Sequence, residues 1–118
     1  MKYMLLIYTD PSTWPTTAAE GQKLMADYGA FTQEIVDSGE LVAGDQLQGV
    51  NVATAVRVRE GRTTTTDGPF AETKEHLGGF YIVDVKDLDR AIALGARVPA
   101  ASTGSVEVRP IVEQTDQG

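Results

Sequence analysis

The chain has no cysteine among its 118 residues. Without cysteine there can be no disulfide scaffold, zinc knuckle or thiol nucleophile, and the composition fits a reducing compartment. Long apolar runs are missing as well. The run at residues 4–8, which follows Lys2 as in a signal peptide, stops at Asp10 and Pro11 and is too short for a signal peptide or a membrane span. We therefore expect a cytoplasmic protein with no membrane partner.

Basic residues are also scarce. The chain has 10 Lys and Arg against 17 Asp and Glu, which gives a net charge of -7. This acidic balance argues against nucleic acid or an anionic membrane surface as a partner. With 42% apolar and 23% charged residues, the composition is that of an ordinary globular domain. We expect one domain over residues 1–112 and a flexible tail over 113–118, which lacks an apolar anchor.

Hydrophobic patterning predicts two central strands and a long helix. Residues 2–8 and 79–83 are apolar on both faces, as in strands that are covered on both sides. Thr17 and Glu20 have the spacing of a capping box, which predicts a helix start. Gly39 is suited to end that helix in a left-handed cap. Its apolar stripe consists of Leu24, Tyr28, Phe31 and Ile35.

The remaining segments complete a recognisable order. Residues 52–59 and 62–66 read as a hairpin around a turn at Glu60 and Gly61. A second helix should start at Asp87 and end before Pro99, followed by a last strand near residues 106–111. The order β-α-β-hairpin-β-α-β predicts an α+β, ferredoxin-like split βαβ fold with an added β-hairpin. Because two helices cover only one face of its sheet, we expect a homodimer to cover the other.

Three segments together resemble the DGPF-type branch of the YCII-related proteins. They are residues 67–75 (DGPFAETKE), 78–81 (GGFY) and 106–110 (VEVRP). The resemblance implies the ferredoxin-like fold, a dimeric α/β barrel in which two sheets face each other, and bacterial origin. Such proteins are often encoded beside extracytoplasmic-function sigma factors, which implies a regulatory setting. The resemblance does not imply any particular reaction, because no biochemical activity is established for these proteins.

The chain departs from the broader YCII-related pattern at one place. That family carries a His–Asp pair proposed as an active site, with the histidine in the first helix and the aspartate before a proline after the second helix. Alignment on Gly39 and Pro99 places Tyr28 and Val98 at these positions. The proposed dyad is therefore absent, and any chemistry would have to come from the 67–76 loop.

The 67–76 loop gathers a tight turn, an aromatic ring, carboxylates, a lysine and the only histidine of the chain. Loops held by a rigid scaffold often carry function, although this one could equally be a structural turn with solvated charges. We expect a ligand to be approached from the loop, with help from tyrosines of the strands and the first helix, and Trp14 could act as a mobile lid. The expected ligand-binding residues are Asp67, Phe70, Glu72, Lys74, His76, Tyr8, Tyr28 and Tyr81.

Three functions remain open. The leading hypothesis is a dimeric protein that binds an unidentified small molecule beside this loop, in a regulatory role. The second is an enzyme without a cofactor that does acid–base chemistry through Asp67, Glu72 or His76. The third is a module that binds a protein partner such as a sigma factor. We expect no cofactor and no metal, because the sequence has no nucleotide fingerprint, EF-hand or paired histidines.

Overall fold

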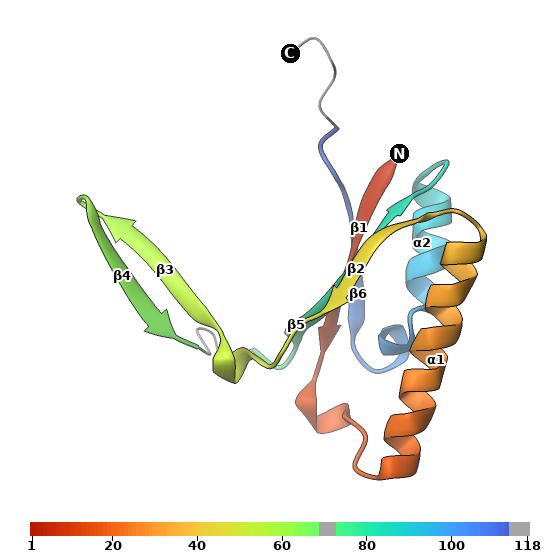
Figure 1. Ribbon diagram of the computed structural model, residues 1–118, viewed down its shortest axis with the longest axis horizontal. Helices are drawn as coiled ribbons and strands as arrows, with labels where there is room; N and C mark the ends of the chain where they lie inside the picture. The colour runs from red at the N-terminus through yellow and green to blue at the C-terminus, as the bar shows by residue number, and fades with distance from the viewer. Residues whose placement is uncertain (69–72, 114–118) are drawn as a thin grey trace.

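A four-stranded antiparallel sheet with two helices on one face forms the body of the molecule (Figure 1). The computed structural model describes residues 1–68 and 73–113. The sheet has the order β2-β5-β1-β6, and a separate two-stranded ribbon consists of β3 and β4. The fold is therefore the expected α+β, ferredoxin-like arrangement with an added hairpin.

The strands are β1 (Lys2–Thr9), β2 (Leu41–Gln46), β3 (Thr54–Arg59), β4 (Arg62–Asp67), β5 (His76–Asp84) and β6 (Ser105–Pro110). The helices are α1 (Ala18–Asp37) and α2 (Leu88–Arg97), with short 3-10 turns η1 (Pro11–Thr13), η2 (Val50–Val52) and η3 (Pro99–Ser102).

The two strands that are apolar on both faces occupy the middle of the sheet, as predicted. Alternate side chains of β1 and β5 point toward the helices and form the core, among them Leu5 and Val83, which are fully buried. The intervening residues point to the other face, where they are only partly covered. We call this second surface the open face, and its apolar members are Met4, Leu6, Tyr8, Phe80 and Ile82.

Helix α1 begins and ends where the sequence predicts. The side chain of Thr17 accepts a hydrogen bond from the backbone N–H of Glu20 at 3.1 Å, and so satisfies one of the unpaired N–H groups of the first turn. Gly39 has a φ of 77°, and its N–H donates to the carbonyl of Val36. The next N–H, that of Glu40, donates to the carbonyl of Ile35, which completes a Schellman cap.

Helix α2 is capped in the same way. Asp87 accepts from the backbone N–H of Arg90 at 2.9 Å, and the helix ends before Pro99. Pro99 begins η3, which leads into β6. The turn η3 also lies against α1, and residues of both elements line the candidate site described below.

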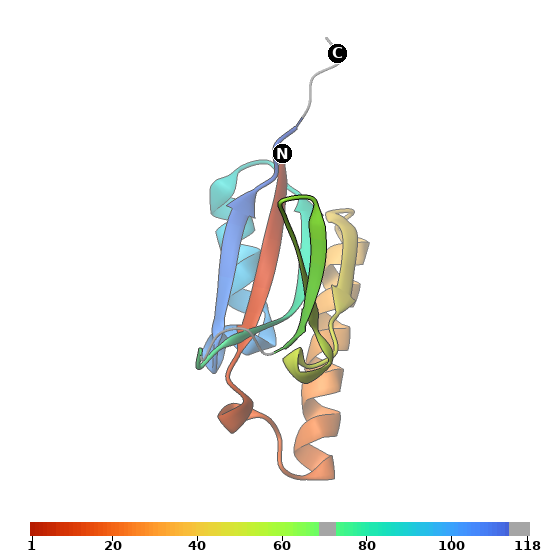
Figure 2. The same cartoon turned by 90° about the vertical axis from the view of Figure 1, so that its left-hand side faces the viewer.

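The β3–β4 ribbon stands on the side of the sheet opposite the two helices (Figures 1 and 2). Its turn residues Glu60 and Gly61 both have positive φ, 53° and 75°. These values match the primed turns that suit the right-handed twist of a two-residue hairpin. At the end of the ribbon away from this turn, the N–H of Gly68 donates to the carbonyl of Ala53 at 2.7 Å.

No helix in residues 1–68 and 73–113 combines the length and the apolar character that crossing a bilayer requires.

Candidate functional site

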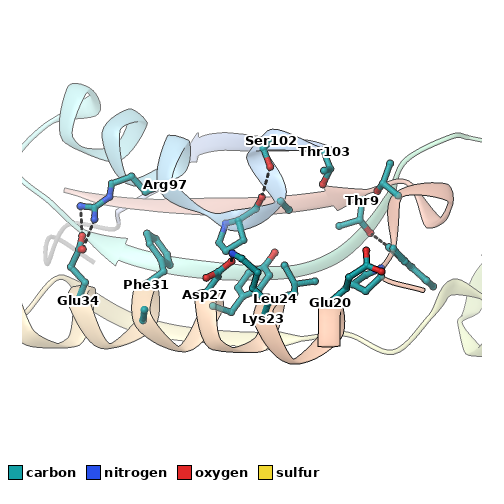
Figure 3. Close-up of a pocket in the computed structure, with 17 residues that line it drawn as sticks. Thr9, Glu20, Lys23, Leu24, Asp27, Phe31, Glu34, Arg97, Ser102 and Thr103 are labelled. Atoms are coloured by element: carbon teal, nitrogen blue, oxygen red, sulfur yellow. Dashed lines mark hydrogen bonds and ion pairs between the residues drawn. The ribbon is translucent and has the colours of Figure 1, made fainter. Parts of the chain in front are cut away.

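A cleft of about 610 Å³ opens between α1, the connection from β1 to α1, and η3 (Figure 3). A volume in this range suits a small organic ligand. Aromatic and other apolar side chains contribute to its wall, and charged side chains and hydroxyls surround them. The lining consists of Thr9, Thr13, Trp14, Pro15, Glu20, Lys23, Leu24, Asp27, Tyr28, Ala30, Phe31, Glu34, Arg97, Pro99, Ala100, Ser102 and Thr103.

Local hydrogen bonds connect the residues of the wall formed by the β1–α1 connection. Asp10 caps η1 by accepting from the backbone N–H of Ser12 at 2.9 Å. This bond holds the pKa of the Asp10 carboxyl below its usual value, with smaller contributions from the charges of Lys74 and His76. Trp14 follows η1, and its indole N–H donates to the hydroxyl of Thr9 at 3.2 Å. The indole is therefore held at the cleft while its side chain stays 51% exposed.

Tyr28 and Phe31 line the cleft on the α1 side, and Tyr81 lies behind them in the core. The rings of Phe31 and Tyr81 meet edge to face with centroids 5.3 Å apart. Burial raises the pKa of the Tyr28 phenol, and the neighbouring Tyr81 adds to this effect. A phenol is already protonated at neutral pH and this shift reinforces that state, so the Tyr28 hydroxyl can donate a hydrogen bond to a ligand.

The charges at the rim of the cleft neutralise one another in pairs. Lys23 lies 3.0 Å from the carboxylate of Asp27, one turn along α1. Arg97 from α2 forms an ion pair with Glu34 of α1, visible at one end of the cleft in Figure 3. Both cations of the lining are thus engaged, while the carboxylate of Glu20 accepts from two hydroxyls, that of Thr17 at 2.8 Å and that of Thr16 at 3.5 Å. Three carboxylates face two cations in the lining, so the local net charge disfavours an anion and tolerates a neutral or cationic group.

The structure separates the ligand-binding residues expected from the sequence. Tyr28 lines the cleft, and Tyr81 lies in the core beneath it. Tyr8 is on the open face, where its hydroxyl lies 3.5 Å from a carboxylate oxygen of Glu107. Asp67 is exposed at the end of β4, opposite Thr54 in the ribbon.

The second half of the 67–76 loop adjoins the cleft only at its edge. His76 is the first residue of β5 and pairs with Thr9, which lines the cleft. Lys74 is exposed, and the Glu75 carboxylate accepts from the hydroxyl of Ser105 at 2.7 Å. The two other expected loop residues, Phe70 and Glu72, lie outside the described residues.

The charged residues of α1 that line the cleft were not singled out from the sequence. Glu20, Lys23, Asp27 and Glu34 are spaced by three, four and seven residues, which keeps them on one side of the helix, and they interleave with its apolar stripe. This overlap of charged and apolar positions on one side of a helix was the available signal. The candidate lid Trp14 was identified, and it does line the cleft.

Of the two positions assigned to the family's His–Asp pair, one lies in the lining of this cleft and the other is buried next to a lining residue. Tyr28 lines it, and Val98 is buried immediately before Pro99, which also lines it. The described lining contains no histidine. Within residues 1–68 and 73–113, no three His, Asp or Glu side chains gather closely enough to hold a metal ion.

Comparison with known proteins agrees with the resemblance drawn from the sequence motifs. The model of the YCII-related domain matches residues 1–115. An uncharacterized protein of Rhizobium meliloti (strain 1021) is 40% identical over 114 residues, which cover 94% of this chain and 92% of that protein. The chain therefore belongs to the family of proteins with a YCII-related domain.

Proposed function

We propose that this protein is a cytoplasmic homodimer that binds a small, flat and largely apolar molecule, neutral or cationic, in the cleft between α1, η1 and η3. The observation that carries the proposal is the lining itself. Trp14, Tyr28 and Phe31 supply aromatic surface, while both cations of the rim are already paired with carboxylates. Ligand sites commonly combine such an apolar wall with a few polar groups that orient the ligand.

The polar groups favour a ligand with hydrogen-bonding capacity and no negative charge. Tyr28 can donate from its neutral phenol, and the hydroxyls of Ser102 and Thr103 lie on the opposite wall. The net charge of -7 attracts cations toward the surface and repels anions. The loop at residues 67–76 would contribute from the Thr9 edge of the cleft, where His76 pairs in the sheet.

The homodimer would cover the open face. Met4, Leu6, Phe80 and Ile82 form a contiguous apolar surface there across the two central strands. In a dimer with a two-fold axis, the open faces of the two copies would pack against each other. This arrangement would give the dimeric α/β barrel implied by the family resemblance. Sedimentation at micromolar concentration should give twice the chain mass of 12.6 kDa.

Binding is favoured over acid–base catalysis at this cleft. An acid–base enzyme requires a titratable pair within hydrogen-bond reach of a substrate. Here the carboxylates of Asp27 and Glu34 are occupied by Lys23 and Arg97, and that of Glu20 accepts hydrogen bonds from the hydroxyls of Thr17 and Thr16. The regulatory setting implied by the resemblance, beside a sigma factor, would make the bound molecule a signal and not a substrate.

A series with one ring system and three charges tests the proposed ligand class. Indole, tryptamine and indole-3-acetate should be titrated calorimetrically into the wild-type protein. We expect indole and tryptamine to bind and indole-3-acetate to bind at least about tenfold more weakly, which corresponds to 1.4 kcal/mol. Equal affinity for all three, or preferential binding of the acid, would contradict the charge preference.

Two variants of α1 locate the binding. Tyr28→Ala removes a ring from the cleft, whereas Met25→Ala changes a side chain on the same helix that is 76% exposed and lies outside the lining. We expect Tyr28→Ala to weaken indole binding by about tenfold or more and Met25→Ala to leave it unchanged. Equal affinities for the two variants would place the binding elsewhere on the surface.

A further inference from the structure

The β3–β4 ribbon has one valine-rich face and one arginine-rich face. In its register, Val56 lies opposite Thr65 and Val58 opposite Thr63, so these four residues share a face. The other face carries Arg57 opposite Thr64 and Arg59 opposite Arg62. Half-covered antiparallel sheets show this alternation, with the apolar face against a partner. We call the Val56, Val58, Thr63 and Thr65 surface the valine face.

The valine face has no partner within the described part of the chain. Val56 is 62% exposed and Val58 is 58% exposed, and Ala55 is the only residue of the two strands that is even partly covered. A two-stranded ribbon without further packing is at best marginally stable in water. The Cα radius of gyration is 16.7 Å, against roughly 13 Å for a compact domain of this length, in keeping with a ribbon that stands away from the body.

The ribbon and the open face border the same space. Both lie on the side of the sheet opposite α1 and α2, and the ribbon rises at an angle from the sheet (Figures 1 and 2). A body seated on the open face would therefore also meet the ribbon. Because the open face is itself apolar, one partner could cover both exposed surfaces in a continuous interface.

The charge of the ribbon favours a second copy of this chain as that body. Arg57, Arg59 and Arg62 are three of the ten basic residues, while Glu60 and Asp67 are its two acids out of seventeen. The ribbon is thus slightly basic, and the rest of the chain carries the whole acidic excess. Because the acidic excess lies outside the ribbon, a second copy attracts the ribbon as a whole, although the arginines lie on the face opposite the valine face.

We infer that the β3–β4 ribbon is an exchanged arm: it crosses the dimer axis and packs its valine face against the second copy. The inference rests on the homodimer proposed above and adds a specific contact to it. By symmetry each copy gives one arm and receives one, so the contact is made twice. Each arm then gains the packing that an isolated ribbon lacks.

Two double variants with unchanged net charge test the arm. Val56→Glu with Val58→Lys disrupts the valine face, and Thr64→Glu with Thr66→Lys places the same charges on the opposite face as a control. All four positions are exposed in the single chain, so neither variant should prevent folding. Sedimentation equilibrium should show a dimer dissociation constant raised about tenfold or more by the valine variant and nearly unchanged in the control.

Hydrogen exchange of the ribbon amides gives an independent readout on the wild-type protein. We expect protection of residues 54–67 to rise with protein concentration as the dimer forms.

Four outcomes would contradict the arm. If the wild type is a dimer and neither double variant changes its dissociation constant, the arm is overturned and the homodimer stays intact. A wild-type monomer would overturn both, and ribbon protection at all concentrations in a monomer would show that the valine face packs on its own chain. If the ribbon amides are protected only when another protein is added, the arm does not pack on a second copy of this chain but on that protein.

Discussion

The phenolic oxygen of Tyr81 lies 2.7 Å from the hydroxyl oxygen of Thr32, so that one hydrogen bond joins central strand β5 to helix α1 behind the cleft. Tyr81 is also packed against Phe31 and against Gly44 of β2. A Cβ at position 44 would lie 2.7 Å from the ring of Tyr81, which explains why that strand has glycine there. The α1 wall of the cleft is thereby supported from behind by contacts of α1 with β5 and of β5 with β2.

Removal of this hydroxyl should destabilise the protein. Tyr81→Phe leaves the partly buried Thr32 hydroxyl without its partner, and we expect a loss of about 1 kcal/mol in the free energy of unfolding. Tyr8→Phe is the matched control, because the Tyr8 hydroxyl has only a 3.5 Å contact with Glu107. Urea denaturation measures both. Equal stabilities of the two variants would mean that the Tyr81–Thr32 bond has no special role.

Two glycines should respond to alanine in opposite directions. A Cβ on Gly104 would lie 2.1 Å from the backbone carbonyl oxygen of Tyr8, so Gly104→Ala must displace β1 or the turn before β6 and should cost about 2 kcal/mol or more. Gly29 lies inside α1, and a Cβ added there would have nothing within 4 Å, so Gly29→Ala should stabilise by about 0.5–1 kcal/mol. Thermal unfolding of both variants checks the pair, and a Gly104→Ala protein as stable as the wild type would contradict the close approach.

The ion pair of Glu40 and Arg90 should make stability depend on pH. Arg90 donates to both carboxylate oxygens of Glu40 at 2.8 Å, and these bonds hold the pKa of the Glu40 carboxyl at about 2, below its ordinary 4.5. A depressed carboxyl pKa stabilises the folded state above the unfolded value, and this contribution is lost as the pH falls toward the folded one. Because Arg90 is partly exposed, we expect Glu40→Gln to cost only about 1–2 kcal/mol at neutral pH.

The pH dependence separates this pair from a general packing effect. The difference in unfolding free energy between wild type and Glu40→Gln should be full above pH 4.5 and should shrink as the pH falls toward 2. Urea denaturation at several pH values measures it. A difference that stays constant over this range would show that the variant acts through packing and not through the charge.

The fold could be predicted because its signals are local. Thr17, Gly39 and Asp87 mark helix ends through side-chain chemistry or a positive φ that a short segment determines. The boundaries of β5 were less accessible. The apolar pattern predicts a strand from Gly79, whereas β5 begins three residues earlier, at His76, and a Cβ on Gly79 would lie 3.0 Å from the carbonyl oxygen of Asp45. The close approach of β2 is a tertiary contact, and it favours glycine at this position.

The cleft could be predicted only in part, because its walls come from distant segments. Tyr28 and Trp14 were named from the sequence, but the pairing of Glu34 with Arg97 joins residues far apart in the chain. The 67–76 loop drew attention because its polar residues are adjacent in sequence. Adjacency along a chain does not bring side chains to one surface, and Asp67 lies on the ribbon while His76 lies in the sheet.

Trp14 is the only tryptophan of the chain and lines the cleft, so it provides a direct reporter of binding there. The measurement is a nitrogen–proton NMR titration with indole that follows the single indole N–H resonance of the protein. If the cleft is the binding site, this resonance and the backbone amides of residues 24–31 should shift together in a saturable way, because the ligand would lie beside the Trp14 ring, whose N–H donates to Thr9. Shifts confined to the sheet or the ribbon, with the Trp14 resonance unmoved at saturation, would contradict the proposed site.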